Sequence, residues 1–434
     1  MRRVSGRRRL AAAASIIAAV LALGLLVPAG AGMSTAVDGA PRATGDLVRS
    51  KEYWLDSYGI RSAWNVTKGA GVTIAIIDTG IDGSVAELRG AVAAGTDFSG
   101  AGTGGGPEGG DGDEHGTMVA SLAAGRGTGS NAGVIGVAPA ASLISASVGF
   151  GAGDENSDQE IADAVTWSVD HGAQVINLSL TRNTLDWPES WDTAFLYAQD
   201  HNVVVVAAAG NRGSGTAEVD APATMPGVLS VGGVTQNGTS STDASAQGIT
   251  LGISAPSENL VGVIPGGGYV LWDGTSGAAP IVAGVVALVR AAHPELSAAN
   301  VINRILATAH DKGAPGADDL YGYGLVDAAA AVRTDVPSVT TNPLGDLHEW
   351  VRVNRRAVVT PSPAASGATI VAPAPVAVAQ PRNPVGTLLP SPVLLQVVGL
   401  PALVVLLMLF VLGGLIVGAV LQFRGLRERD RRTR

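Results

Sequence analysis

Residues 273–280 read Asp273-Gly274-Thr275-Ser276-Gly277-Ala278-Ala279-Pro280, and the rest of the fold can be inferred outward from them. Small residues surround the hydroxyl of Ser276, and a mostly apolar run from Val282 to Ala292 follows closely. This run predicts a buried helix. Because the N-terminus of a helix favours negative charge, Ser276 is a candidate nucleophile beside a site that suits an oxyanion.

A serine hydroxyl is a weak nucleophile unless a base and a group that orients the base accompany it. Both occur upstream. The continuous apolar run from Val72 to Ile77 predicts a strand buried on both faces, and Asp78 follows at its end. His115 opens a helix-like stretch directly after a glycine-rich, acidic loop. We therefore expect Asp78, His115 and Ser276 to meet as acid, base and nucleophile.

The pattern of apolar runs indicates an α/β domain. Such runs at 72–77, 141–148, 174–180, 203–209 and 228–234 alternate with helix-like stretches at 161–170 and 192–200. Alternation of this kind predicts a mainly parallel sheet covered by helices on both faces, that is, three layers. The length of 434 residues permits one large domain with a substantial core.

Three motifs resemble the signatures of the subtilisin-like serine proteases. They are Asp78-Thr79-Gly80-Ile81-Asp82, His115-Gly116-Thr117-Met118-Val119-Ala120 and Gly274-Thr275-Ser276-Gly277-Ala278-Ala279-Pro280. Their order of acid, base and nucleophile is that of subtilisin and differs from the orders in chymotrypsin and the α/β-hydrolases. The similarity extends from about Tyr53 to Ala331. It implies the subtilisin-like three-layer fold and a serine endopeptidase that works through an acyl-enzyme.

The resemblance also implies further site residues. Asn211, which follows the apolar run 203–209, would donate its side-chain amide to the oxyanion. Ser179 and Leu180 would belong to the strand that binds the substrate backbone, so the substrate would be an extended polypeptide. We expect no cofactor and no catalytic metal. Four acidic side chains could still ligate a structural calcium ion, since calcium prefers several oxygen ligands: Asp82, Asp111, Asp113 and Glu114.

Three positions depart from the family pattern. Gly277 stands where a larger apolar residue such as methionine is frequent, and Thr181 and Ser257 stand where glycine is common. None of these departures removes a catalytic group. They do mean that cleavage specificity cannot be carried over from the family.

The first 31 residues have the pattern of a signal peptide. Five arginines precede a mostly apolar run from Leu10 to Pro28, and Ala29-Gly30-Ala31 fits a cleavage site. An uncleaved anchor is the alternative. Residues 32–52 form a short segment before the expected protease domain at 53–335, too short for a separately folded inhibitory pro-domain, so we expect the enzyme to fold without one.

The C-terminal part predicts attachment to a membrane. The 25 residues from Val397 to Leu421 carry no charge and are long enough to cross a bilayer, so we expect a transmembrane segment at 393–423. Residues 424–434 form a basic tail, which the positive-inside rule places in the cytoplasm, with the catalytic domain outside it. Residues 336–392 are rich in proline and alanine and predict an extended stalk, in which the less proline-rich stretch 347–359 could form one small element.

Charge and cysteine content narrow the possible partners. Removing the five charges of the first nine residues and the net four of the basic tail from the formal charge of −9 leaves −18 for the remaining chain. Such an acidic surface disfavours nucleic acid as a partner. Cysteine is absent, so the domain must be stable without disulfides and no thiolate metal site can form.

The order of segments resembles that of the mycosins, membrane-anchored proteases associated with type VII secretion. The resemblance implies a cell-membrane location and a secretion complex as partner. Two other functions stay open. A structural component of such a complex would not need the catalytic groups, and a serine esterase could use the same three side chains, although its residue order would differ.

Overall fold

A seven-stranded parallel sheet forms the centre of the domain. The structure, a computed structural model, describes residues 45–107, 113–149 and 157–355. The strands lie in the order β2-β3-β1-β4-β5-β6-β7, and every neighbouring pair is parallel. Their bounds are β1 Thr73–Asp78, β2 Val92–Asp97, β3 Ser142–Ser147, β4 Val175–Leu178, β5 Val204–Ala208, β6 Leu229–Val234 and β7 Ile253–Pro256.

Strand β1 explains why the central strands are continuous apolar runs. Its side chains alternate between two cores: Ile74 and Ile76 pack into one, and Ala75 and Ile77 into the other. Because both faces of the sheet are covered, neither side of the strand can carry polar groups without cost. Asp78, at the carboxyl end, is the exception and is fully buried.

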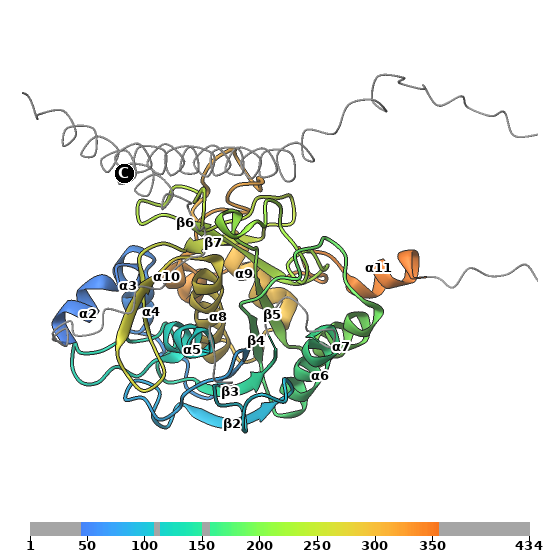
Figure 1. The fold of residues 1–434 in the computed structure, drawn as a ribbon. Helices are drawn as coiled ribbons and strands as arrows, with labels where there is room; N and C mark the ends of the chain where they lie inside the picture. The colour runs from blue at the N-terminus through green and yellow to red at the C-terminus, as the bar shows by residue number, and fades with distance from the viewer. Residues whose placement is uncertain (1–44, 108–112, 150–156, 356–434) are drawn as a thin grey trace, which may run out of the picture. The chain divides into compact units, whose positions relative to one another are not determined.

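Helices cover the two faces of the sheet (Figure 1). Helices α5 and α8 pack into one core, together with α9 and α10. Helices α6 and α7 pack into the other core. Their bounds are α5 His115–Ala124, α6 Ser157–Asp170, α7 Glu189–Asp200, α8 Thr275–Ala292, α9 Ala298–Ala307 and α10 Ala328–Arg333.

The predicted three-layer α/β fold with a mainly parallel sheet is therefore confirmed. The five strands expected from the apolar runs correspond to β1, β3, β4, β5 and β6. The edge strands β2 and β7 were not predicted. The residues of β2 are partly exposed, so its sequence lacks a continuous apolar run.

A small antiparallel hairpin precedes the helix of the candidate nucleophile. It consists of β8 Leu260–Val263 and β9 Tyr269–Trp272, with Leu260 opposite Trp272. Three short helices lie at the N-terminal end of the described chain: α2 Gly45–Lys51, α3 Trp54–Ser57 and α4 Ile60–Ala63. A single 3-10 turn, Arg212–Ser214, follows β5.

The domain extends beyond the boundary that was expected at residue 335. Residues 336–355, which we call the C-terminal strap, run along its surface and end in α11 Leu347–Asn354. The amide of Asn300 on α9 exchanges two hydrogen bonds with the backbone of Val339, at 3.1 and 2.8 Å. Asp346 then caps α11. The expectation of an extended stalk starting at 336 was therefore wrong for residues 336–346, because polar side chains on the domain pair with the strap backbone. The small element that was left open at 347–359 corresponds to α11.

Within the described residues, α8 has the length and apolarity of a membrane span, but 83% of its sequence window is buried in the domain. It is the central core helix. The predicted signal peptide at 1–31, most of the stalk, the transmembrane segment at 393–423 and the basic tail lie outside the described residues.

Candidate active site

The acid and the base are held together by the packing of α5 against the end of β1. The Oδ1 atom of Asp78 lies 2.8 Å from Nδ1 of His115. Asp78 Oδ1 also accepts a hydrogen bond of 2.8 Å from the backbone amide of Thr79. A Cβ atom at Gly116 would lie 2.3 Å from the carbonyl oxygen of Gly80, so glycine is needed for this close approach.

The surroundings of His115 raise its pKa. Burial of the ring lowers the pKa, but the charge of Asp78, the hydrogen bond that His115 donates to it and the charge of Glu114 together outweigh burial, so the pKa is above the ordinary value of 6.5. A raised pKa describes an imidazole that accepts a proton readily. This is the property that a general base requires.

Ser276 lies in the first turn of α8, and its neighbours in the structure are on β4 and the loop after it. Its hydroxyl donates to the backbone oxygen of Ser179 at 3.1 Å. In return the hydroxyl of Ser179 donates to the backbone oxygen of Ser276 at 2.8 Å. The side-chain amide of Asn177, fully buried on β4, donates to Ser179 Oγ at 2.9 Å. This chain of hydrogen bonds fixes the start of α8 against the sheet.

Asn211 is held in place by the residue before the candidate nucleophile. Its Oδ1 atom accepts hydrogen bonds from the backbone amide and the hydroxyl of Thr275, at 2.8 and 3.0 Å. The hydroxyl of Thr275 accepts in turn from the amide of Gly210 at 3.1 Å. With Oδ1 engaged in this way, Nδ2 is the atom of Asn211 that can donate to a substrate.

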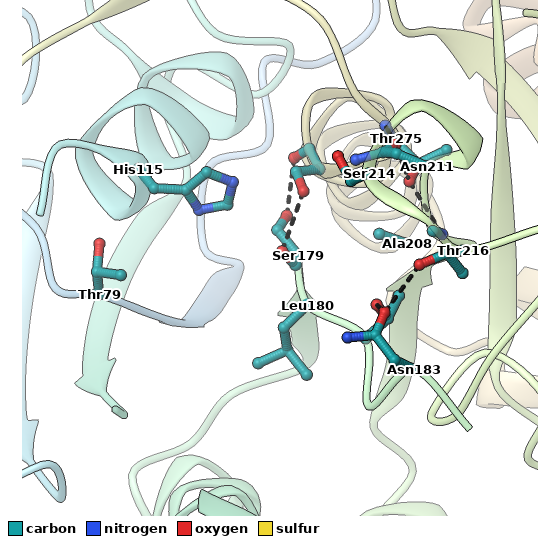
Figure 2. Close-up of a pocket in the computed structure, with 13 residues that line it drawn as sticks. Thr79, His115, Ser179, Leu180, Asn183, Ala208, Asn211, Ser214, Thr216 and Thr275 are labelled. Atoms are coloured by element: carbon teal, nitrogen blue, oxygen red, sulfur yellow. Dashed lines mark hydrogen bonds between the residues drawn. The ribbon is translucent and has the colours of Figure 1, made fainter. Parts of the chain in front are cut away.

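A pocket of about 380 Å³ brings these residues together. His115, Ser276, Asn211, Ser179 and Leu180, all predicted site residues, line it. Asp78 lies behind His115, fully buried. Figure 2 shows the ring of His115 directed across the pocket toward Ser179. The structure therefore places every predicted site residue in or directly behind one cavity, while their roles in a reaction stay predictions.

The wall of the pocket away from His115 is polar. The hydroxyl of Thr216 donates to Oδ1 of Asn183 at 2.8 Å, and both residues line the pocket with Thr181 (Figure 2). Gly210 must be glycine here, since a Cβ atom would lie 2.3 Å from the methyl group of Thr216. A side chain that enters here meets hydroxyl and amide groups.

The structure accounts for two of the departures from the family pattern. Space beside Gly277 is filled by Leu260 and Trp272, whose nearest atoms lie 2.3 and 3.2 Å from where a Cβ atom would stand. Ser257 is fully buried, and its hydroxyl has a partner there because it donates to the backbone oxygen of Val234 at 3.3 Å. Thr181, the third departure, lines the pocket.

The candidate calcium ligands do not form a site within the described residues. No group of three or more histidine, aspartate or glutamate side chains placed to hold a metal occurs there. Asp82 instead accepts hydrogen bonds from Ser84 and, at 2.8 Å, from the amide of Gly266 in the turn of the hairpin. Asp111 lies outside the described residues.

Sequence reasoning missed three residues that position the site: Asn177, Thr79 and Thr275. Thr79 Oγ1 accepts a hydrogen bond of 3.0 Å from the amide of Gly116, which joins the acid loop to α5. Asn177 had a recognisable signal, since it is the one polar residue of the strand Val175–Leu178. A buried polar residue in such a strand needs a partner.

Comparisons with known proteins agree with this geometry. The family model described as "Subtilase family" matches residues 69–324. Alkaline elastase YaB of Bacillus sp. is 36% identical over 265 residues, which cover 61% of this chain and 65% of the elastase. Mycosin-1 of Mycobacterium tuberculosis is 36% identical over 339 residues, which cover 65% of this chain and 74% of the mycosin.

A comparison with solved structures also finds a mycosin. The crystal structure of MycP1 from the ESX-1 type VII secretion system superimposes with a TM-score of 0.59 and 33% sequence identity. The match covers 67% of this chain and 88% of that structure. The chain thus spans just under two thirds of the length of the bacterial elastase, and most of the length of the solved MycP1 structure.

Proposed function

Because the chain belongs to the subtilase family, we propose that it is a serine endopeptidase in which Asp78, His115 and Ser276 cut peptide bonds. The observation that carries the proposal is the Asp78–His115 contact of 2.8 Å behind a pocket that His115 and Ser276 both line. The acid orients the base, and the base faces the cavity in which the nucleophile lies.

The reaction begins with a rotation of the Ser276 hydroxyl. In the structure it donates to the backbone oxygen of Ser179, so it must turn about its Cα–Cβ bond toward Nε2 of His115. His115 then takes the hydroxyl proton while Ser276 Oγ attacks the carbonyl carbon of the substrate. Asp78 keeps the other ring proton on Nδ1 and stabilises the imidazolium that forms.

The oxyanion of the tetrahedral intermediate is stabilised by Asn211 Nδ2 and the backbone amide of Ser276, which also lies at the N-terminus of α8. His115 gives its proton to the leaving amine. Water then attacks the acyl-enzyme with His115 as base, which releases the acid product and restores Ser276.

The substrate is an extended polypeptide. Ser179 and Leu180 follow the end of β4 and line the pocket, where a substrate strand could pair with their backbone. Thr181, Asn183 and Thr216 offer hydroxyl and amide groups to a substrate side chain, beside the apolar side chains of Leu180 and Ala208.

We also propose that the protease is anchored in the cell membrane by residues 393–423 and works beside a type VII secretion complex. The uncharged run from Val397 to Leu421 supports the anchor. The likeness to MycP1 from the ESX-1 type VII secretion system supports such a complex as the partner. The catalytic domain then lies outside the cytoplasm and the basic tail inside it.

Labelling with a fluorophosphonate probe tests the catalytic proposal. We expect the full chain to be labelled, and tryptic mass spectrometry to find the label on the peptide that contains Ser276. The variants S276A and H115A lose the label, whereas S214A keeps it, although Ser214 lines the same pocket. An unlabelled wild-type protein that is folded by circular dichroism would contradict the proposal and favour a purely structural role.

Fractionation tests the anchor. The full chain should stay in the membrane pellet after alkaline carbonate extraction, and a chain that ends at residue 392 should be released. Release of both forms would show that residues 393–423 do not hold the protein in the membrane.

A further inference from the structure

An asparagine lines the pocket on the side opposite the candidate base. Asn183 belongs to the loop that follows β4, and Figure 2 shows it across the cavity from His115 and beside Thr216. In the proposed reaction His115 gives a proton to the leaving amine, so the leaving group lies near His115. The residue that supplies the scissile carbonyl, called P1, lies on the other side of the broken bond. Its side chain therefore extends away from His115, toward the wall that contains Asn183.

The backbone holds Asn183 in a conformation that few residue types adopt. Its φ is +57°, in the left-handed region, where asparagine is one of the few residues other than glycine that occur. Two hydrogen bonds of 2.8 Å fix the loop on either side. The amide of Arg182 donates to the backbone oxygen of Ala221, and the amide of Ala221 donates to the backbone oxygen of Thr184. The side chain of Asn183 thus leaves a turn that is anchored on both sides.

The side-chain oxygen of Asn183 is engaged by the protein, and its side-chain nitrogen is not. Oδ1 accepts a hydrogen bond of 2.8 Å from the hydroxyl of Thr216 and one of 3.4 Å from the hydroxyl of Thr181. Within the described residues Nδ2 donates to no protein group, and it is accessible because Asn183 is exposed. Figure 2 shows Nδ2 on the side of the carboxamide away from Thr216. One hydrogen-bond donor is therefore left for a group that enters the pocket.

The pocket offers no charged partner besides the base. Among the described residues that line it, His115 has the one side chain that ionises near neutral pH. Arg182, next to Asn183 in sequence, already pairs with Asp158 through two contacts of 2.8 Å. A carboxylate or an ammonium group on P1 would lose water here without meeting an opposite charge. A neutral oxygen acceptor needs only the donor that Asn183 supplies.

We infer that Asn183 is a specificity-determining residue whose Nδ2 atom donates to a side-chain carbonyl oxygen at P1, so that the preferred P1 residue is asparagine or glutamine. The inference rests on the proposed protease function and adds a substrate class to it. Thr216 orients the carboxamide of Asn183 for this role. Leu180 and Ala208, which also line the pocket, provide apolar contact for the methylene groups of the same side chain.

Peptides that differ only at P1 test the inference. Glutamine resembles methionine in length, and asparagine resembles leucine in shape, but only the two amides carry a neutral carbonyl oxygen. We expect kcat/KM of the wild type to be about five- to tenfold higher for glutamine than for methionine, and for asparagine than for leucine, because one neutral hydrogen bond is gained. Glutamate, which has the shape of glutamine, should be cleaved more slowly than glutamine because its charge is unpaired. Equal values of kcat/KM within each pair would overturn the inference.

Variants at residue 183 separate recognition from a merely structural role. Glycine adopts a left-handed φ without strain, so N183G should keep the loop but lose the preference, with the ratio of kcat/KM values falling to about one. N183D keeps the acceptor for Thr216 and places a carboxylate in the pocket, so it should gain cleavage after lysine. T216V lacks the hydroxyl that orients Asn183 and should reduce the preference.

The matched control is L185A, because Leu185 is exposed in the same loop and does not line the pocket. It should keep the wild-type ratios. Melting curves show whether each variant is folded. Substitutions of Asn183 that slow the cleavage of every peptide by the same factor, with the ratios unchanged, would show a structural role only and overturn the inference.

Binding to an inactive variant distinguishes failure of the inference from failure of the protease proposal. Peptides that end at P1 are products of the reaction, and S276A can bind them without turnover. By isothermal titration calorimetry, a peptide that ends in glutamine should bind S276A about five- to tenfold more tightly than one that ends in methionine, and S276A/N183G should bind both equally.

The outcomes of the two experiments are distinct. If fluorophosphonate does not label the wild type and no peptide is cleaved, but the difference in binding is found, the protease proposal falls and the role of Asn183 stands. If the wild type is labelled and cleaves every peptide without preference, the protease proposal stands and the inference falls. Peptides that bind S276A equally, or do not bind it, would also overturn the inference.

Discussion

The side-chain oxygen of Asn211 accepts two hydrogen bonds from Thr275, the residue directly before the candidate nucleophile. These bonds orient the amide group, so that its nitrogen and not its oxygen is available to the pocket. The loop after β5 and the start of α8 are thereby joined at the point where an oxyanion would form. Asn211 thus has a structural role and a proposed catalytic one, and substitutions can separate them.

For Asn211 we predict that N211D and N211A both lower kcat by about 10²–10³, with little change in KM. Aspartate keeps the acceptor for Thr275 but replaces the donor with negative charge, so N211D should fold like the wild type and still lose activity. A melting curve for each variant provides the control. An N211D enzyme with wild-type kcat would rule out the oxyanion role.

For Asp78 we predict that D78N lowers kcat by about four orders of magnitude, because asparagine can donate to Nδ1 of His115 and so favours the wrong tautomer. Because Oδ1 of Asp78 serves both His115 and the Thr79 amide, an asparagine that turns its NH2 group to His115 also loses the bond from Thr79, and a melting curve of D78N is the control for the loop. Burst kinetics with an active-site titrant measure the acylation rate directly. Acylation at the wild-type rate would exclude Asp78 as the orienting acid.

The pH dependence of kcat/KM follows from the raised pKa of His115. Only the neutral imidazole can accept the Ser276 proton, so activity should fall as the pH decreases through a value above 6.5. Asp78 and Glu114 are the charged groups that raise this pKa, and burial opposes them. In D78N the larger raising contribution is lost, so the acid limb of its residual activity should move to lower pH. A limb that moves to higher pH would contradict this assignment.

A second pH effect concerns stability and arises at Glu52. Burial raises the pKa of this carboxyl from 4.5 to about 8, although Arg49 lies 2.7 Å away and opposes the shift. Between these two values the folded protein holds a proton that the unfolded chain has released, so stability decreases as the pH rises through this window. E52Q cannot titrate, and its melting temperature should therefore decline less between pH 5 and 9.

The quantity to compare is the difference in melting temperature between the wild type and E52Q at each pH. Taking the difference removes the contribution of other groups that titrate in the same window. Arg49 keeps its hydrogen bonds to the backbone oxygens of Ala132 and Gly133 in E52Q. Parallel melting curves for the two proteins across the pH range would mean that Glu52 is charged in the folded state at pH 5.

The C-terminal strap should contribute to stability through Arg355. Its guanidinium lies 2.7 Å from Asp192 and donates to the backbone oxygen of Trp187, and it packs over the Trp350 ring. We predict that R355A lowers the free energy of unfolding by about 1–3 kcal/mol, because it leaves a buried carboxylate without this partner. R352A is the control: Arg352 pairs with Glu349 on the exposed face of α11, so its loss should not change the urea midpoint measurably.

Much of the fold could be predicted because buried parallel strands leave a simple pattern. The run from Val72 to Ile77 is apolar at every position except Thr73, and Asp78 ends it, which located both a strand and a site residue. The strand β2 left no such pattern, and for α11 the lower proline content of 347–359 indicated only one small element of unspecified type. The former is partly exposed, and α11 has one fully buried residue, Leu347.

The candidate catalytic residues of the site were predicted, but the residues that hold them in place were not. Asp78, His115 and Ser276 were found from motifs that are local in sequence, whereas their supports depend on contacts between distant segments. Trp272 is an example: its ring centroid lies 5.8 Å from that of His115, and the pairing of β8 with β9 helps to place it there. No spacing rule in one sequence encodes such a contact.

The strap has a mechanical consequence for a protein whose chain continues beyond Arg355. Tension applied from that side is first resisted by the hydrogen bonds that Arg355 donates to Asp192 and to the backbone oxygen of Trp187, before it can reach the sheet. The helix that takes the load, α7, packs in a different core from α5 and α8, which carry the base and the nucleophile. Pulling on the chain beyond Arg355 would thus load the core that contains α7 before the core that contains α5 and α8.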